Sequence, residues 1–331
     1  MTEYSYKVAC LRFIVVAPEN FDIEALLPSF SPFRVEGEDG RFDTSASSVS
    51  RKISELDDAV EPHQAVDATA CLFHFTLRLD PIMVPENAEK VEEDENDMGR
   101  TRLSKAPDGS YCLELSYGER GNGQMCGTDS GIFMANASFS EVNAFACSSS
   151  RYLGLILSSM LRIAFAQAVI LRDGISLHAS AVVAEGRAYL FLGRSGTGKS
   201  THARMWLRAI PGSRLLNDDN PAVRVIGGEV IAFGTPWSGK TPCYRSESYP
   251  VGGVARLVQW DSDIFMKKED DAAFVALLPS CSVVHSDACL QSRLCDTVAK
   301  IVGLIPIGEL KCLPDREAAL MCYNNFKSLI K

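Results

Sequence analysis

The sequence predicts a two-domain α/β protein in which a β-rich first half precedes a half where strands alternate with helices. A chain of 331 residues with 46% hydrophobic residues is long enough for two hydrophobic cores. The charged residues are also distributed unevenly. Residues 1–150 contain 12 Lys and Arg and 26 Asp and Glu, whereas residues 151–331 contain 21 Lys and Arg and 16 Asp and Glu. We therefore expect a β-rich domain over residues 1–147 and an α/β domain over residues 148–331.

The first half shows strand patterns separated by turn signals. β-Branched and aromatic residues recur over residues 6–16 and 72–79, and a third such stretch, residues 111–117, follows the turn Pro107-Asp108-Gly109. Each stretch is expected to be a strand. Acidic residues are concentrated in residues 86–97, where we expect a solvated loop or the tip of a hairpin.

A helix is predicted over residues 148–171 as the connector between the halves. Its apolar residues recur at helical spacing, and Ser158, Arg162 and Gln167 interrupt the apolar run. These interruptions favour a buried amphipathic helix over a membrane span.

The second half begins with a predicted β-hairpin. Residues 176–183 and 188–192 are expected strands, joined by the tight turn Glu185-Gly186-Arg187. A glycine-rich loop and a helix from about residue 199 follow. Beyond these we expect short strands at 214–216, 222–226 and 230–232, a Gly- and Pro-rich segment at 234–253, and mostly helix from 270 to the end.

The cysteines and the start of the chain favour the cytoplasm. The eleven cysteines include no C-x-x-C pair, and the first ten residues lack the basic and apolar regions of a secretory signal. A reducing compartment suits free cysteines, and their spacing does not indicate zinc. The acidic first half argues against a nucleic-acid partner.

Residues 193–200 match the phosphate-binding pattern G-x-x-x-x-G-K-[ST], the P-loop or Walker A motif. Glycines let the backbone turn its N–H groups toward phosphate oxygens, Lys199 can reach the β- and γ-phosphates, and the Ser200 hydroxyl can bind Mg²⁺. The match lies between a predicted strand and a predicted helix, as the motif requires. We therefore expect ATP and Mg²⁺ as cofactors, with the nucleotide bound by Gly193, Arg194, Ser195, Gly196, Thr197, Gly198, Lys199, Ser200 and Thr201.

Residues 234–241 match the same pattern in an unsuitable context. Pro236 lacks an N–H group, Trp237 would crowd a phosphate loop, and no helical pattern follows Pro242. We expect a Gly- and Pro-rich loop here. Lys240 could still clamp a substrate or the γ-phosphate.

Two adjacent carboxylates, Asp218 and Asp219, follow the predicted strand at residues 214–216. The sequence Asn-Asp-Asp-Asn-Pro is by itself a typical turn. Beside a P-loop, however, a carboxylate at the end of a neighbouring strand suits Mg²⁺, and a second one can accept the proton of an attacking hydroxyl. We assign Asp218 as the base, and Asp219 and Ser200 as metal ligands. The opposite assignment, with Asp219 as the base and Asp218 as the metal ligand, stays open.

Two histidines near the P-loop have different interpretations. His178 lies in the strand preceding the one that leads into the loop, so it could contact Asp218 and tune or relay a proton. A histidine with its hydrogen bonds satisfied in the core is the alternative. His202, at the start of the predicted helix, is expected at the surface.

The order of these motifs resembles the catalytic domain of HPr kinase/phosphorylase. The similarity lies in Leu177-His178-Ala179-Ser180-Ala181-Val182, in residues 191–201 and in Leu215-Leu216-Asn217-Asp218-Asp219. It covers about residues 175–257, with a weaker similarity at residues 305–321. The chain is more similar still to HPr-kinase-like proteins encoded near ribosomal peptide maturation genes, which also carry a segment like residues 234–240.

The resemblance implies a phosphoenolpyruvate-carboxykinase-like P-loop domain, preceded here by the β-rich N-terminal domain. It also implies transfer of phosphate from ATP to a serine hydroxyl, with His178 and Asp218 at the positions of the family's histidine and catalytic aspartate and with Asp219 and Ser200 close to the metal. The glycine-rich segment that follows the paired acids in true HPr kinases is missing. HPr itself is therefore not the expected acceptor.

We expect an ATP-dependent kinase that transfers the γ-phosphoryl group to a hydroxyl, with Asp218, His178, Lys199 and Lys240 as catalytic residues. Its expected partners are ATP and a peptide, protein or small-molecule acceptor. We expect no nucleic-acid partner and no membrane partner. Whether the chain forms a homo-oligomer stays open. The alternative is an ATP-binding or ATPase scaffold that regulates a peptide-modification pathway. A carboxykinase-like enzyme is less favoured, because no arginine set for a carboxylate substrate can be picked out.

Overall fold

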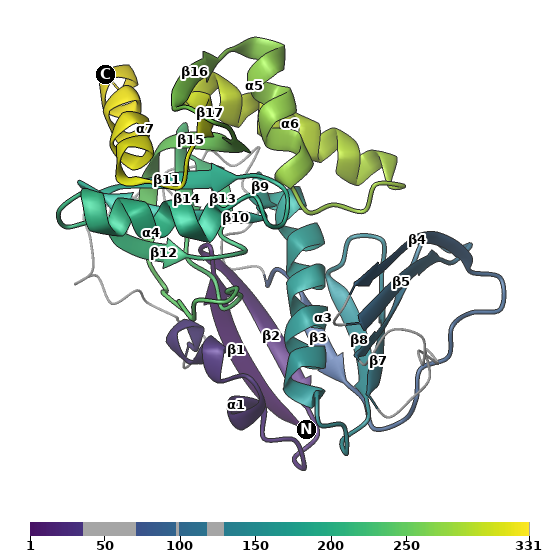
Figure 1. Cartoon of the computed structure of the whole chain (residues 1–331). Helices are drawn as coiled ribbons and strands as arrows, with labels where there is room; N and C mark the ends of the chain where they lie inside the picture. Colours follow the sequence, from purple (N-terminus) through teal and green to yellow (C-terminus); the bar gives the residue numbers. More distant parts are fainter. Residues whose placement is uncertain (36–70, 97–98, 118–128, 331) are drawn as a thin grey trace. The chain divides into compact units, whose positions relative to one another are not determined.

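The computed structural model describes residues 1–35, 71–96, 99–117 and 129–330. It is a mixed α/β protein with two sheets (Figure 1). The described residues form two compact units, one from residues 1–35, 71–171 and 283–291, the other from residues 172–282 and 292–330. The domain division at residue 147 stays a prediction, and the helix expected as connector groups with the first unit.

The first unit is built on one mixed sheet. Within its described part, β3 is parallel to β2 and β8, and the other neighbouring strands are antiparallel. The strand order is β1-β2-β3-β8-β7-β6-β5-β4. The strands are β1 (Thr2–Val8), β2 (Leu11–Ala17), β3 (His74–Leu77), β4 (Glu89–Asn96), β5 (Gly99–Lys105), β6 (Tyr111–Tyr117), β7 (Ser130–Ala135) and β8 (Glu141–Ala146).

The single strand predicted over residues 6–16 is wrong, because the chain forms the hairpin β1–β2 there. Ala9 and Cys10 make the turn with φ angles of 52° and 64°. Glycine or asparagine is usual in this left-handed region, so the turn left no signal in the sequence. The strands predicted at residues 72–79 and 111–117 are confirmed as β3 and β6.

The acidic stretch at residues 86–97 was expected to be a loop or hairpin tip, and most of it is the edge strand β4. Glu93 on this strand forms ion pairs with Lys90, Arg100 and Arg102. The Lys90 hydrogen bond and the two arginines lower the pKa of Glu93 to about 2. Charges on an edge strand also discourage pairing with another chain, so the composition suits this position.

The helix predicted over residues 148–171 is confirmed as α3 (Leu153–Ala168), followed by the 3₁₀ turn η3 (Val169–Arg172). It contacts β6, β7 and β8, and Ile156, Met160 and Phe165 are fully buried. Leu153–Arg172 is long and apolar enough to cross a membrane by length and composition, yet 67% of that window is buried inside the protein. The short helices α1 (Ile23–Leu26) and η1 (Pro28–Phe33) complete the unit.

The second unit contains a mixed sheet with helices beside it. The strand order is β12-β10-β11-β15-β14-β13-β9, and β17 pairs with both β15 and β16. The elements are β9 (Gly174–Ser176), β10 (Ala179–Ala184), β11 (Arg187–Leu192), α4 (Lys199–Ala209), β12 (Arg214–Asn217), β13 (Ala222–Ile226), β14 (Glu229–Phe233), β15 (Ser248–Gln259), β16 (Ile264–Lys268), α5 (Asp270–Leu277), η4 (Leu278–Ser280), α6 (Ala288–Leu304), β17 (Ile307–Cys312) and α7 (Arg316–Leu329).

The strand predicted over residues 176–183 is interrupted at Leu177 and His178. The chain changes neighbours there, since β9 pairs with β13 whereas β10 pairs with β11 and β12. The hairpin between β10 and β11 is confirmed, and its turn lies at Glu185 and Gly186. The helix from residue 199 is confirmed as α4, and the three short strands after it as β12, β13 and β14.

Three strands were missed in the last third of the chain. β15 occupies part of the segment expected to be an irregular Gly- and Pro-rich loop, β16 lies in a stretch without a prediction, and β17 lies where helix was expected. A Cβ atom at Gly252 would collide with the Tyr189 ring, and one at Gly253 with the Phe326 ring. These glycines therefore allow close packing within a strand and do not indicate a loop.

Helices α4 and α7 pack against β10, β11, β15 and β17 to form the core of the second unit (Figure 1). Trp206, Phe191 and Phe326 are fully buried in this core. The Trp206 and Phe191 ring centroids are 5.1 Å apart. This packing fixes the first turn of α4 against the end of β11.

His202 was expected at the surface, but only 3% of it is exposed. Its Nε2 accepts a hydrogen bond from Trp206 Nε1 at 3.0 Å, and its ring lies edge-on to Phe191. Burial lowers the pKa of His202 to about 4. The helical spacing of His202 and Trp206 was the signal that both side chains face the core.

The neutral, buried His202 predicts a loss of stability in mild acid. Its unfolded-state pKa is about 6.5, so the unfolded chain binds more protons as the pH falls from about 6.5 toward 4. The free energy of unfolding should decrease over that window by up to about 3 kcal/mol from this group. His202→Gln keeps an acceptor for the indole but does not titrate, so urea unfolding at several pH values should show a shallower decline. Equal pH dependence in the two proteins would contradict this role.

Candidate functional site

The loop at residues 193–200, which carries the P-loop sequence pattern and keeps that name, connects β11 to α4, the strand–loop–helix context predicted from the sequence. Gly196 and Gly198 have φ angles of 81° and 105°, where a residue with a Cβ would be strained. Gly198 is the N-cap of α4, so the free N–H groups of the first helical turn lie at the loop. Backbone donors at a helix N-terminus favour an anion.

Lys199 lies within the curve of the P-loop. Its Nζ donates to the backbone oxygens of Gly193 at 2.9 Å and Arg194 at 3.3 Å, and the residue is 8% exposed. Burial lowers the pKa of the Lys199 ammonium, and the carboxylates of Asp219 and Asp218 oppose this shift. The position of the ammonium beside the loop carbonyls suits it to meet a phosphate group bound by the loop.

His178 joins this lysine to the acidic pair. Its Nε2 is 2.9 Å from Lys199 Nζ, and its Nδ1 is 3.1 Å from Asp219 Oδ1. Because an ammonium can only donate, Nε2 accepts and Nδ1–H donates to the carboxylate. The expected contact of His178 with Asp218 is therefore wrong, since the break between β9 and β10 directs the ring to Asp219.

The Asp218 carboxylate is buried, with 5% of the residue exposed. Its Oδ1 accepts a hydrogen bond from Ser180 Oγ at 2.7 Å, whereas Oδ2 is buried without a hydrogen-bond partner in the described part of the chain. Burying such an atom unpaired is costly, which makes this oxygen a candidate for a ligand contact. Ser180 was not predicted, because its position depends on the pairing of β10 with β12.

Asn217 fixes the backbone of the acidic pair, and sequence reasoning missed this role too. Its Oδ1 accepts from the N–H groups of Asp219 and Asn220, and its Nδ2 donates to Trp237 O at 3.0 Å. The turn recognised in the sequence therefore forms, and it orients the carboxylates. A turn at these residues is therefore compatible with a candidate site formed by Asp218 and Asp219.

The segment at residues 234–241 lacks the structure of a phosphate loop. The next element after it is the strand β15 and not a helix, and Trp237 is 5% exposed. A Cβ atom at Gly239 would lie 2.8 Å from the backbone oxygen of Asp218 and 3.3 Å from Asp219 Cβ. The segment thus passes directly against the acidic turn, with Lys240 exposed beside Gly239.

Lys240→Ala should retain ATP affinity within about tenfold, or roughly 1.4 kcal/mol, but lower turnover. Lys240 is exposed next to the acidic turn and is not enclosed by the P-loop backbone. Calorimetric titration with Mg·ATP and a steady-state rate separate the two effects. Complete loss of ATP binding would show that residues 234–241 are the nucleotide loop.

The remaining predicted P-loop residues lie along the loop and the first turn of α4. Arg194 and Ser195 are exposed, and Ser200 is half-buried. The Thr201 hydroxyl accepts from Arg204 Nη2 at 3.2 Å. Gln259, at the end of β15, was not predicted, and its Nε2 donates to the P-loop at Gly196 O (3.4 Å) and Thr197 O (3.3 Å).

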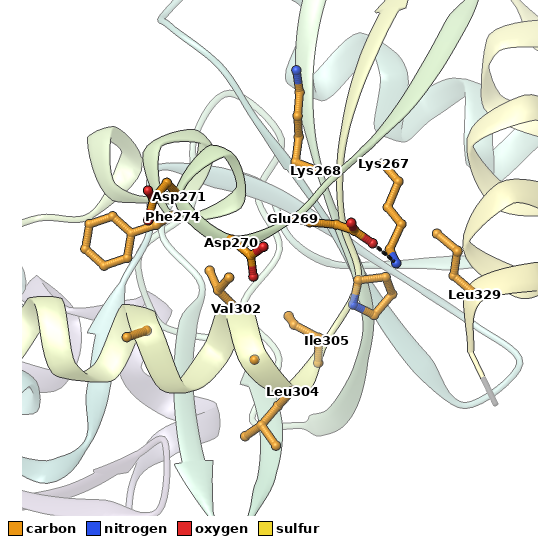
Figure 2. Close-up of a pocket in the computed structure, with 13 residues that line it drawn as sticks. Lys267, Lys268, Glu269, Asp270, Asp271, Phe274, Val302, Leu304, Ile305 and Leu329 are labelled. Carbon is orange, nitrogen blue, oxygen red and sulfur yellow. Dashed lines mark hydrogen bonds and ion pairs between the residues drawn. The ribbon is translucent and has the colours of Figure 1, made fainter.

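A separate pocket of about 820 Å³ lies at the amino end of β17, whereas the P-loop follows the carboxyl end of the parallel strand β11. Figure 2 shows Lys267 paired with Glu269 at this pocket. None of the predicted site residues lines it. Its wall includes charged and apolar side chains, among them Lys267, Glu269, Asp270, Phe274, Val302 and Ile305.

No protein-family model and no curated protein matches the chain. Among solved structures, it is similar to the HPr(Ser) kinase/phosphatase from Coxiella burnetii, with 12% sequence identity and a TM-score of 0.29. The match covers 46% of this chain and 89% of that chain. A TM-score this low supports no inference about activity.

Proposed function

We propose that the chain is an ATP-dependent phosphotransferase that moves the γ-phosphoryl group of ATP to a hydroxyl, with a serine of a peptide or protein as the preferred acceptor. The observation that supports it most is the continuous chain of contacts from the P-loop lysine to the acidic pair. Lys199 contacts His178, and His178 contacts Asp219. A phosphate-binding cation and a carboxylate pair are thereby held together, as transfer from a nucleotide to a hydroxyl requires.

The donor set fits a magnesium ion. Asp219 carries a carboxylate next to Asp218 in the acidic turn, and the Ser200 hydroxyl lies in the first turn of α4. Carboxylate and hydroxyl oxygens are the ligands that Mg²⁺ prefers. Bound by Asp219 and Ser200, the ion would neutralise charge on the phosphate oxygens.

Each residue of the site then has a separate role in the transfer. Asp218 Oδ2 accepts the proton of the acceptor hydroxyl as its oxygen bonds to the γ-phosphorus and the bond to the β-phosphate oxygen breaks, releasing ADP. Ser180 holds the other carboxylate oxygen, so Oδ2 is the one available. Lys199 and the P-loop N–H groups stabilise the charge on the transferred group. His178 positions Asp219 and Lys199.

The fate of labelled phosphate tests this function. The full chain is incubated with γ-labelled ATP, Mg²⁺ and serine-containing peptides or small alcohols, and the products are separated. Label on a hydroxyl supports a kinase, and Asp218→Asn serves as the inactive control. Label recovered entirely as free phosphate would favour the ATPase scaffold, and unconsumed ATP would reject both.

A further inference from the structure

Trp260 differs from the other two tryptophans of the chain in its exposure. Trp206 is fully buried and Trp237 is 5% exposed, whereas Trp260 is 50% exposed directly after the end of β15. The preceding residue, Gln259, donates its side-chain amide to the P-loop backbone. An exposed indole thus follows a residue that contacts the candidate phosphate site.

The strand register places Trp260 at the edge of the sheet where the P-loop follows β11, with its side chain on the face of β15 opposite to that of Gln259. In the parallel pairing of β11 and β15, Leu192 is opposite Arg256, so Gln259 lies three residues beyond the end of β11. That extension corresponds to about 10 Å along the strand. β15 therefore continues alongside the P-loop, and Trp260 follows at the same edge of the sheet.

Trp260 is half exposed, and one lysine lies over its ring. Lys311 Nζ lies 4.6 Å from the centroid of its ring. On β17, Cys312 is the register partner of Gln259. The next residue, Leu313, is 42% exposed. Aromatic rings at the edge of a phosphate site typically stack on nucleobases, because every base has a π-face.

We propose that Trp260 is the stacking platform for the nucleobase of the nucleotide bound by the P-loop. This inference rests on the proposed function and adds a base subsite to it. The P-loop binds the phosphates, and Trp260 gives a nucleotide an advantage over a polyphosphate without a base.

Binding of ATP and of inorganic tripolyphosphate to the full chain, measured by calorimetry with Mg²⁺, separates the base from the phosphates. Trp260→Ala should lower ATP affinity about tenfold, within the range for one stacked base, and leave tripolyphosphate affinity unchanged. Trp260→Phe should restore most of the loss. Leu304→Ala, which removes another half-exposed apolar side chain at the amino end of β17, should change neither affinity.

Equal ATP affinity in the wild type and Trp260→Ala would overturn the inference and leave the proposed function standing. An equal loss of ATP and tripolyphosphate affinity in Trp260→Ala would also overturn it, since the substitution would then act on the phosphate site. If neither probe binds the wild type, the proposed function fails, and the base subsite fails with it. ATP quenching of tryptophan fluorescence that disappears in Trp260→Phe would support the stacked arrangement independently.

Discussion

Lys199→Ala is expected to weaken Mg·ATP binding at least about a hundredfold, or about 2.7 kcal/mol, in calorimetric titration. The substitution removes the ammonium from the curve of the P-loop, where it contacts two loop carbonyls and His178. Lys240 lies on a different segment and is not expected to replace this ammonium. The fold should persist, since Lys199 is absent from the apolar core formed by α4 and α7.

A circular dichroism spectrum and an unfolding midpoint close to those of the wild type are the controls for Lys199→Ala. Lys240→Ala provides the matched lysine substitution, with a much smaller expected effect on affinity. Unchanged ATP affinity in Lys199→Ala would mean that residues 193–200 do not bind the phosphates.

Asp218→Asn is expected to lower the rate of phosphoryl transfer at least about a hundredfold, the range for loss of a general base, with ATP affinity little changed. Asparagine keeps the size of the side chain and an oxygen that can accept from Ser180 Oγ, which now bonds Asp218 Oδ1 at 2.7 Å. It cannot take the proton of an acceptor hydroxyl. Single-turnover transfer rates of the two proteins measure the difference.

Asp219→Asn is the matched control for the neighbouring carboxylate, and it should raise the Mg²⁺ concentration needed for half-maximal rate. If the rate loss follows Asp219 and the Mg²⁺ requirement follows Asp218, the two roles are reversed. A wild-type rate in Asp218→Asn would reject this residue as the base. If neither substitution has an effect, the acidic pair is a turn without a catalytic role.

The P-loop and the elements beside it were predictable because their signals are local. The turn at Glu185 and Gly186 and the loop glycines constrain the backbone at fixed positions, so β10, β11 and α4 followed from the sequence. Short apolar stretches predicted β12 to β14 in the same way. The turn at Ala9 and Cys10 carries no such residue, and there the prediction failed.

The contacts of the candidate site required the strand pairing, which the sequence pattern does not contain. Ser180 reaches Asp218 because β10 pairs with β12, and His178 reaches Asp219 because the chain changes neighbours before β10. Gln259 reaches the P-loop because β15 is parallel to β11 and extends past it. Lys199, His178 and the acidic pair were thus recognisable as candidates from the sequence, whereas their contacts with Ser180 and Gln259 were not.

Hydrogen–deuterium exchange of the full chain with and without Mg·ATP tests nucleotide binding at the P-loop most directly, because backbone N–H groups of that loop are the proposed phosphate donors. We predict that saturating Mg·ATP slows exchange in peptides covering residues 193–200 of the wild type and has no such effect in Lys199→Ala. Exchange that slows at residues 234–241 but stays unchanged at residues 193–200 would contradict the assignment, as would an unchanged pattern along the whole chain.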